Sequence, residues 1–222
     1  FLSNMPTAIR HIIIINILVM IMTSLNGDFM YQHFALFYPT SHFFRWWQPV
    51  THMFMHGGFW HLFFNMYTLY IFGSLLENIW GSKKFFLYYM VTGLGAAFLH
   101  ELVMFFQAES YTAAIAAGNA YAGMKLKMLM LTPTVGASGA IYGLLLAYGM
   151  MFPNNIMRLI FPPIALKAKW FVLIFGIIEF TSGISGAMGN TGDNVAHFAH
   201  LGGMLFGIII ILYWKKTNRL YY

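Results

Sequence analysis

The sequence predicts an all-α membrane protein, a bundle of six transmembrane helices in a single domain of residues 1–222. Of its 222 residues, 59% are hydrophobic and only 8% are charged, and the mean hydropathy is +0.67. A soluble domain carries about 25% charged residues, so most of this surface cannot face water. Six apolar runs approach the roughly 20 residues that a spanning helix needs. The predicted helices are residues 8–25, 59–76, 85–106, 135–152, 170–188 and 195–214.

The composition also excludes several classes of protein. The chain has no cysteine, which excludes disulfides, thiolate metal sites and a cysteine nucleophile. Its formal net charge is +6, but the basic residues occur singly or in pairs beside apolar runs. Basic residues in that position orient a membrane protein and do not form a nucleic-acid surface. We therefore expect the lipid bilayer as a partner, no nucleic acid, and no metal or other cofactor.

Residues 26–58, between the first two predicted helices, are crowded with aromatic side chains and interrupted by Pro39 and Pro49. The segment is too aromatic for a solvated loop and too broken for a span. Aromatic and amphipathic segments of this kind collect at the membrane surface. We expect an interfacial first loop.

The distribution of basic residues predicts that both termini are cytoplasmic. With the N-terminus inside, nine Lys and Arg side chains lie on the inner side and three on the outer side. The inner residues are Arg10, Lys83, Lys84, Arg158, Lys167, Lys169, Lys215, Lys216 and Arg219, and the outer residues are Arg45, Lys125 and Lys127.

Residues 113–132 are apolar enough to compete as a seventh span. The segment contains Asn119, Lys125 and Lys127, and its insertion would invert every later helix and abolish the charge bias. We expect it to be part of a long outer loop with helical or interfacial character.

The predicted topology brings four polar residues to a similar depth. The second, fourth and sixth helices all run from the outer to the inner side. His61 and Asn65 lie near the start of the second, Ser138 near the start of the fourth, and His200 about one turn into the sixth. Because polar groups are costly in hydrocarbon, we expect these side chains to face one another or a water-filled cavity.

Small residues on the same helices allow close packing. Two glycine pairs have G-x-x-x-G spacing, Gly139 with Gly143 and Gly203 with Gly207. Such pairs are also ordinary packing motifs of membrane helices. Their positions beside Ser138 and His200 favour packing that brings these two side chains together.

This chemistry predicts a serine nucleophile. A serine hydroxyl attacks a carbonyl only when a base takes its proton, and His200 is the best candidate for the base that activates Ser138. We expect no carboxylate behind His200, since Asp193 falls in a loop and Glu179 lies near the middle of the fifth helix, too deep for the role. The sequence therefore favours a Ser/His dyad.

Other residues are expected to support this pair. His61 and Asn65 are four residues apart on one helical face and can donate hydrogen bonds to an oxyanion. Tyr142, four residues after Ser138, can pack against the imidazole. The remaining supporting set comprises the backbone around Gly136 and Ala137, and His56 and His197, which lie near the site and are equally open to a structural role.

Several motifs resemble the rhomboid family of intramembrane serine proteases, from about residue 45 to residue 207. They are Gly136-Ala137-Ser138-Gly139, His197-Phe198-Ala199-His200-Leu201-Gly202-Gly203, the set His56, His61 and Asn65, the set Gly73, Glu77, Gly81 and Ser82, and Arg45-Trp46-Trp47-Gln48.

The resemblance, to the bacterial six-helix type, implies a Ser138 and His200 dyad with an oxyanion site at His61 and Asn65. It also implies transmembrane protein substrates with a single span, cut near the outer face, a fifth helix that acts as a movable gate, and a bacterial cytoplasmic membrane. Residues 101–132 depart from the family, because they are longer than in minimal members.

Two rival functions remain open. One is a rhomboid-like protein that binds clients without cutting them, against which the presence of both Ser138 and His200 argues. The other is a membrane metal or haem protein, because histidine is a common ligand. Its candidate ligands are His52, His56, His61, His197 and His200.

Overall fold

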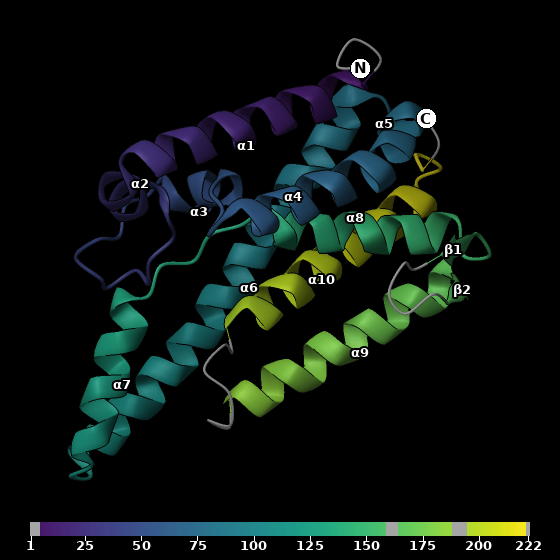
Figure 1. Cartoon of the computed structure of the whole chain (residues 1–222). Coiled ribbons are helices and arrows are strands. Elements are labelled where there is room, and N and C mark those ends of the chain that lie inside the picture. The colour runs from purple at the N-terminus through teal and green to yellow at the C-terminus, as the bar shows by residue number, and fades with distance from the viewer. Residues whose placement is uncertain (1–4, 159–163, 188–194, 221–222) are drawn as a thin grey trace.

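The computed structural model describes residues 5–158, 164–187 and 195–220, and these form an all-α bundle with one small hairpin (Figure 1). The elements are α1 Thr7–Leu25, α2 Gly27–Phe34, α3 Gln48–Thr51, the 3₁₀ turn η2 His52–Phe54, α4 Phe59–Thr68, the π-helical turn η3 Leu69–Gly73, α5 Ser74–Trp80, α6 Ser82–Ala116, α7 Ala120–Leu131, α8 Ser138–Met151, β1 Ile156–Arg158, β2 Ala165–Lys167, α9 Ala168–Ala187 and α10 Val195–Lys216.

Four of the described helices, α1, α6, α9 and α10, are long and apolar enough to cross a membrane, whereas α8 is apolar but shorter. The N-terminal end of α1 and the C-terminal end of α10 lie at the same end of the bundle (Figure 1). The class of fold, an all-α membrane bundle, is confirmed. The count of six spans and the cytoplasmic side of the termini stay predictions, and the expected end of the fifth helix at Met188 lies outside the described residues.

Helices α4 and α5 follow one continuous path, joined through the π-helical turn η3. The backbone stays in the right-handed helical region from Thr68 through Ser74. The path ends at Gly81, whose φ of +77° lies in the left-handed region, as expected for a glycine that stops a helix.

A buried carboxylate ties three helices together at this end of the bundle. Glu77 Oε1 and Oε2 accept hydrogen bonds from the backbone N–H groups of Ala8 (2.7 Å) and Ile9 (2.9 Å), at the start of α1. The hydroxyl of Ser82, the first residue of α6, donates to Glu77 Oε1 at 2.6 Å. Glu77 therefore caps the N-terminus of α1, where a negative charge is favoured.

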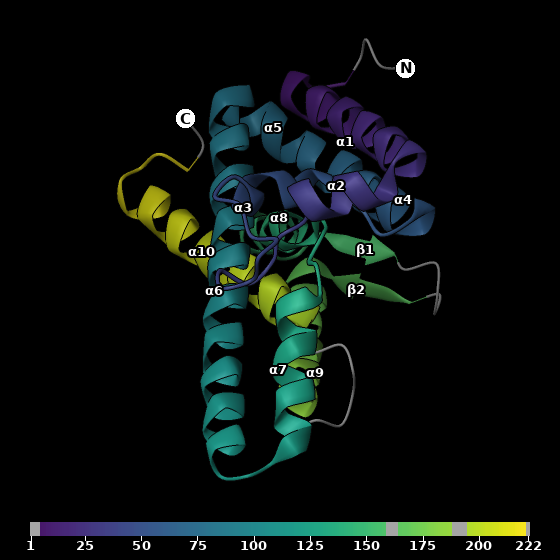
Figure 2. The same cartoon turned by 90° about the vertical axis from the view of Figure 1, so that its left-hand side faces the viewer.

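Helix α6 is much longer than the expected residues 85–106. Its 35 residues correspond to about 52 Å at 1.5 Å per residue, well beyond a hydrocarbon layer of roughly 30 Å. Helix α7 then returns beside it, so that the two helices extend away from the rest of the bundle as a hairpin (Figure 2). The helical character expected for residues 113–132 is present, since they comprise the end of α6 and the whole of α7.

Helices α6, α8 and α10 pack against one another at the centre of the fold. Small residues make this possible, because a Cβ added to Gly203 would collide with the carbonyl oxygen of Gly139, and one on Gly207 would lie 2.5 Å from the hydroxyl oxygen of Tyr88 on α6. The glycines of α8 in turn face α6, where a Cβ on Gly143 would lie 2.7 Å from Thr92 Cβ. Helix α8 is therefore held between two helices whose backbones approach it closely.

Helix α9 lies at the edge of the bundle beside α10 (Figure 1). A short antiparallel hairpin, β1 paired with β2 from Ile156 opposite Lys167 to Arg158 opposite Ala165, precedes it. An open apolar groove of about 430 Å³ runs along α8, α9 and α10, with Val172, Gly176 and Met204 among its lining. Helix α9 has fewer contacts with the bundle than the three central helices have with one another.

Replacing Gly203 by Ala should lower the melting temperature of the protein in detergent, because the new methyl group meets the backbone of α8. Overpacking of a tight interface typically costs about 1–3 kcal/mol. The matched control is Gly123→Ala on α7, where an added Cβ meets no atom within 4 Å, so that the melting temperature should hold or rise. Equal effects of the two substitutions would contradict this account of the helix packing.

Candidate functional site

Ser138 is the first residue of α8 and follows a constrained turn. Gly136 has a φ of +138°, a region that L side chains rarely adopt, and its N–H donates to the carbonyl of His52 at 3.0 Å. Just before it, Thr134 and Leu36 exchange two backbone hydrogen bonds of 2.8 and 2.9 Å. The segment before α8 is therefore bonded to the first loop. These bonds set the position of Ser138 at the start of the helix.

The structure brings the hydroxyl of Ser138 to the imidazole of His200. Ser138 Oγ lies 2.8 Å from His200 Nε2, although the two residues are 62 positions apart. This distance depends on the close packing of α8 against α10 at Gly139, directly after Ser138, and at Gly203, three residues after His200. For Nε2 to accept the hydroxyl proton, the neutral ring must carry its own proton on Nδ1.

Tyr142 lies one turn after Ser138 and stacks on the imidazole of His200. Their ring centroids are 4.1 Å apart with an interplanar angle of 8°. The tyrosine hydroxyl donates to Glu179 Oε1. Tyr142 therefore restrains the plane of the His200 imidazole and also contacts the carboxylate of Glu179.

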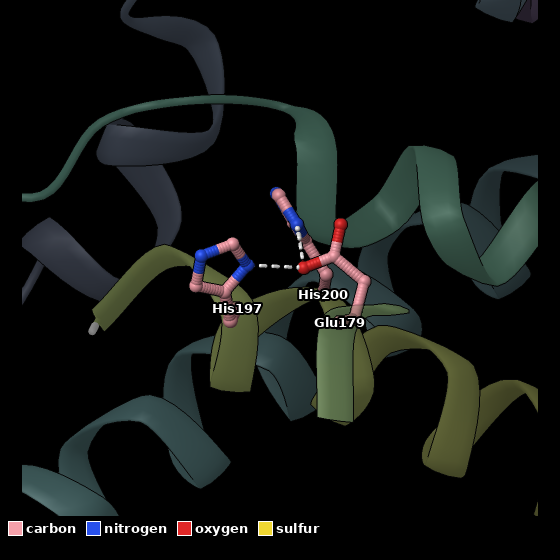
Figure 3. Close-up of side chains that lie close together, drawn as sticks. All are labelled: Glu179, His197 and His200. Carbon is pink, nitrogen blue, oxygen red and sulfur yellow. Dashed lines mark hydrogen bonds and ion pairs between the residues drawn. The ribbon is translucent and has the colours of Figure 1, made fainter. Parts of the chain in front are cut away.

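Glu179 lies behind His200, which makes the prediction of no carboxylate at this position wrong. Its Oε2 is 3.1 Å from His200 Nδ1, an ion-pair distance, and 2.6 Å from His197 Nδ1 (Figure 3). Both histidines come from α10 and the glutamate from α9. The carboxylate is buried, with 8% of its side chain exposed.

The expectation that Glu179 lies too deep to reach His200 was wrong because it compared positions along the helices and ignored the length of the side chain. At 1.5 Å per residue, Glu179 lies about 12 Å from the described end of α9, and His200 about 8 Å from the start of α10. The difference along the axis is within the reach of a glutamate side chain. A carboxylate inside an apolar span is itself a signal of function, and that signal was present in the sequence. The other acidic candidate, Asp193, lies outside the described residues.

The second-helix residues lie on the other side of Ser138. A Cβ built on Gly136 would lie 3.0 Å from His61 Nε2 and 3.5 Å from Ser138 Oγ, which places His61 near the hydroxyl of Ser138. The N–H of Gly57 donates to His61 Nδ1 at 3.3 Å, so a neutral ring carries its proton on Nε2. Asn65 is buried one turn below, and its amide donates to the His61 carbonyl at 3.1 Å.

His52 and His56 are buried behind the site, outside the spanning helices. The ring of His56 meets that of His61 edge to face at 4.9 Å, and His52 Nδ1 lies 3.0 Å from the carbonyl of Gln48. Burial lowers the pKa of His52 to about 4 and, together with the nearby His61, that of His56 to about 3. Both rings are therefore neutral at physiological pH.

A small cavity of about 30 Å³ adjoins Ser138, with the backbone of Gly136, Thr134 and His52 in its lining. That is room for about one water molecule next to the hydroxyl. The buried Ala137, the N-cap of α8, completes this turn.

Among the described residues, one group of three histidine or acidic side chains is compact enough to share a metal ion: Glu179, His197 and His200. His52, His56 and His61 do not join it. The nitrogens of His197 and His200 converge on a single carboxylate oxygen (Figure 3), which is the pattern of two donors that share an acceptor. Metal ligands must instead surround a point about 2 Å from each of them.

The fold and this site define a helical membrane protein with a serine and a histidine paired inside the bundle. A family model described as the rhomboid domain matches residues 44–216. The chain belongs to the rhomboid family.

Known relatives support this assignment. The chain is 29% identical over 181 residues to rhomboid-like protein 11, chloroplastic, of Arabidopsis thaliana, covering 81% of this chain and 56% of that protein. It is 31% identical over 172 residues to the presenilin-associated rhomboid-like protein, mitochondrial, of Bos taurus, covering 75% and 39%. It is 25% identical over 165 residues to rhomboid protein 1, mitochondrial, of Saccharomyces cerevisiae, covering 74% and 40%.

The chain therefore spans about half or less of the length of these relatives. Their names refer to chloroplasts and mitochondria, and so give no support to the bacterial membrane that the resemblance implied.

Acid should destabilise the fold through His52 and His56. Each binds a proton in the unfolded chain near the ordinary pKa of 6.5 but in the folded chain only near pH 4 or 3. Stability should therefore fall as the pH drops below about 6.5, by about 2 kcal/mol per histidine at pH 5. Melting temperatures in detergent at pH 7.5 and 5 test this. The fall should be smaller in His56→Gln and unchanged in His11→Gln, an exposed position on α1; equal falls in all three proteins would contradict it.

Proposed function

We propose that this protein is an intramembrane serine endopeptidase in which Ser138 is the nucleophile and His200 the general base. The observation that carries the proposal is the 2.8 Å distance between Ser138 Oγ and His200 Nε2 inside a membrane bundle. A serine in a membrane helix ordinarily bonds to its own backbone one turn back, but here its hydroxyl contacts a base from another helix. Membership of the rhomboid family supports the same reaction.

The reaction begins when Ser138 Oγ attacks the scissile carbonyl carbon and its proton passes to His200 Nε2. The carbonyl oxygen becomes an oxyanion in a tetrahedral intermediate. When the C–N bond breaks, the imidazolium returns the proton to the leaving amine, and an acyl ester remains on Ser138. His200 then takes a proton from water, and the hydroxide attacks the ester carbonyl carbon. The C–O bond to Ser138 breaks, the imidazolium returns the proton to Oγ, and the carboxylic acid product leaves.

His61 is the best-placed side chain to stabilise the oxyanion. The N–H of Gly57 holds Nδ1, so that Nε2 carries the proton on the side of Gly136 and Ser138. Asn65 is buried directly below and has a second amide hydrogen besides the one given to the His61 carbonyl. Together with backbone N–H groups near Ser138, these donors would meet charge as it develops.

We propose transmembrane proteins with a single span as substrates, cut near the outer face. A regular helix keeps its carbonyl groups hydrogen-bonded and out of reach, so cleavage requires a segment that unwinds easily. Small residues at the cut, with Gly or Pro just beyond it, are the expected preference.

Cleavage of a generic single-span substrate by purified protein in detergent tests the proposal. Wild type should cleave, Ser138→Ala should not, and a chelator should change neither result. A fluorophosphonate probe should label Ser138 in wild type and fail to label His200→Ala.

Absence of both cleavage and labelling in correctly folded wild type would leave a client-binding protein. Activity that a chelator abolishes would return the histidines to metal chemistry.

His61→Ala should lower kcat by about 10²- to 10³-fold, the usual loss on removal of one oxyanion donor, and Asn65→Ala should be impaired without being fully inactive. The matched control is Phe64→Ala on the same helix, where the side chain is 61% exposed. Cleavage rates measured on the single-span substrate test this prediction. Full activity of His61→Ala would remove it from the oxyanion site.

A further inference from the structure

We propose that Glu179 is a positioning residue for His200, and that it makes the alignment of the base depend on where helix α9 lies. The proposal rests on the proposed function. It gives the pair of Ser138 on α8 and His200 on α10 a third member on another helix. This member is Glu179 on α9, which lies beside His200 in Figure 3.

A buried carboxylate in a spanning helix needs partners. Such a charge is expensive in hydrocarbon and persists only where other groups compensate it. Glu179 has three neighbouring donors, the hydroxyl of Tyr142 and the Nδ1 atoms of His197 and His200. None of the three comes from its own helix, so the carboxylate faces the site and not the lipid.

The geometry assigns the direction of the contact. An ionised carboxylate only accepts, so Nδ1 of His200 carries the proton that faces Glu179 Oε2 at 3.1 Å. Nε2 is then left without a proton and can accept the one from Ser138 at 2.8 Å. When that proton arrives, the imidazolium faces a negative charge across Nδ1, and Glu179 itself stays ionised throughout.

The other two donors hold the carboxylate for this purpose. Tyr142 fixes Oε1 and also stacks on the imidazole, so one side chain restrains both the ring and its partner. His197 makes the shorter contact to Oε2, at 2.6 Å, while His200 Nδ1 lacks a fully aligned hydrogen bond. Catalytic hydrogen bonds of a free enzyme commonly tighten when substrate binds.

The contacts of Glu179 all cross from α9 to its neighbours. Further along the same helix, an open apolar groove of about 430 Å³ runs beside α8 and α10, and α9 has fewer contacts with the bundle than the central helices have with one another. A displacement of α9 away from α10 would withdraw the carboxylate from His200 while leaving the contact of Ser138 with His200 in place. Full alignment of the base thus requires α9 to be seated on the bundle.

Glu179→Gln is the variant that tests the proposal, because it keeps the shape and removes the charge. We expect kcat on the single-span substrate to fall by at least about 100-fold, with KM within threefold and slower labelling of Ser138. The matched control is Glu109→Gln on α6, an exposed glutamate far from the site, which should keep wild-type kinetics. A fall in kcat of less than tenfold in a folded Glu179→Gln protein would overturn the proposal.

The pH profile separates positioning from a structural role. The titratable groups that face His200 are Glu179 from α9, Tyr142 from α8, His197 from α10 and His61 from α4. Of these only Glu179 loses its charge in the variant. Because the carboxylate stabilises the protonated ring, the acidic limb of the kcat/KM profile should move to lower pH in Glu179→Gln. An unmoved acidic limb would overturn the proposal.

A measurement on wild type keeps the test decisive if the variant does not fold. ¹⁵N NMR of histidine-labelled protein in detergent, with His200 assigned by its loss in His200→Asn, should report a proton on Nδ1 and none on Nε2. The opposite tautomer would overturn the proposal. Wild-type cleavage together with either contrary result would refute the role of Glu179 alone, whereas wild type without cleavage or labelling would refute the proposed function itself.

Discussion

The close approach of α8 and α10 is the constraint on which the rest of the site depends. At Gly203 no Cβ fits, because the carbonyl of Gly139 occupies that space. Ser138 and His200 sit one residue before Gly139 and three before Gly203, so the backbone contact sets the distance between hydroxyl and imidazole. Side chains of ordinary size at these positions would move the helices apart by more than a hydrogen bond tolerates.

Hydrogen bonds to the first loop also fix the position of Ser138. The turn before Ser138 is bonded to the first loop through the Leu36 and Thr134 pair and through the carbonyl of His52. Gln48, completely buried, accepts from the N–H groups of Phe37 and Arg45 and donates to the Phe43 carbonyl, which orders the loop itself. The aromatic first loop is therefore ordered by its own hydrogen bonds, and it supports the turn that precedes Ser138.

Much of this arrangement could be predicted from sequence, because the hydrocarbon of a membrane requires long apolar helices and penalises unpaired polar groups. Apolar length indicated most helices, and the cost of polar groups in lipid indicated that Ser138 and His200 should meet. What sequence could not supply was side-chain reach and helix pairing. Depth along the helix axis alone places Glu179 too far from His200, although its side chain reaches the imidazole. Apolar length alone ends the third helix near the membrane surface, although α6 continues into a hairpin with α7.

Because the site is divided among three helices, it forms late in the synthesis and assembly of the chain. Ser138 is synthesised 41 residues before Glu179 and 62 before His200, and each enters the membrane on a separate apolar segment. Until α10 packs into the bundle, the serine has no base and the carboxylate has neither histidine partner. If Ser138 is the nucleophile, as we propose, a chain in which α10 has not yet packed against α8 cannot attack neighbouring membrane proteins.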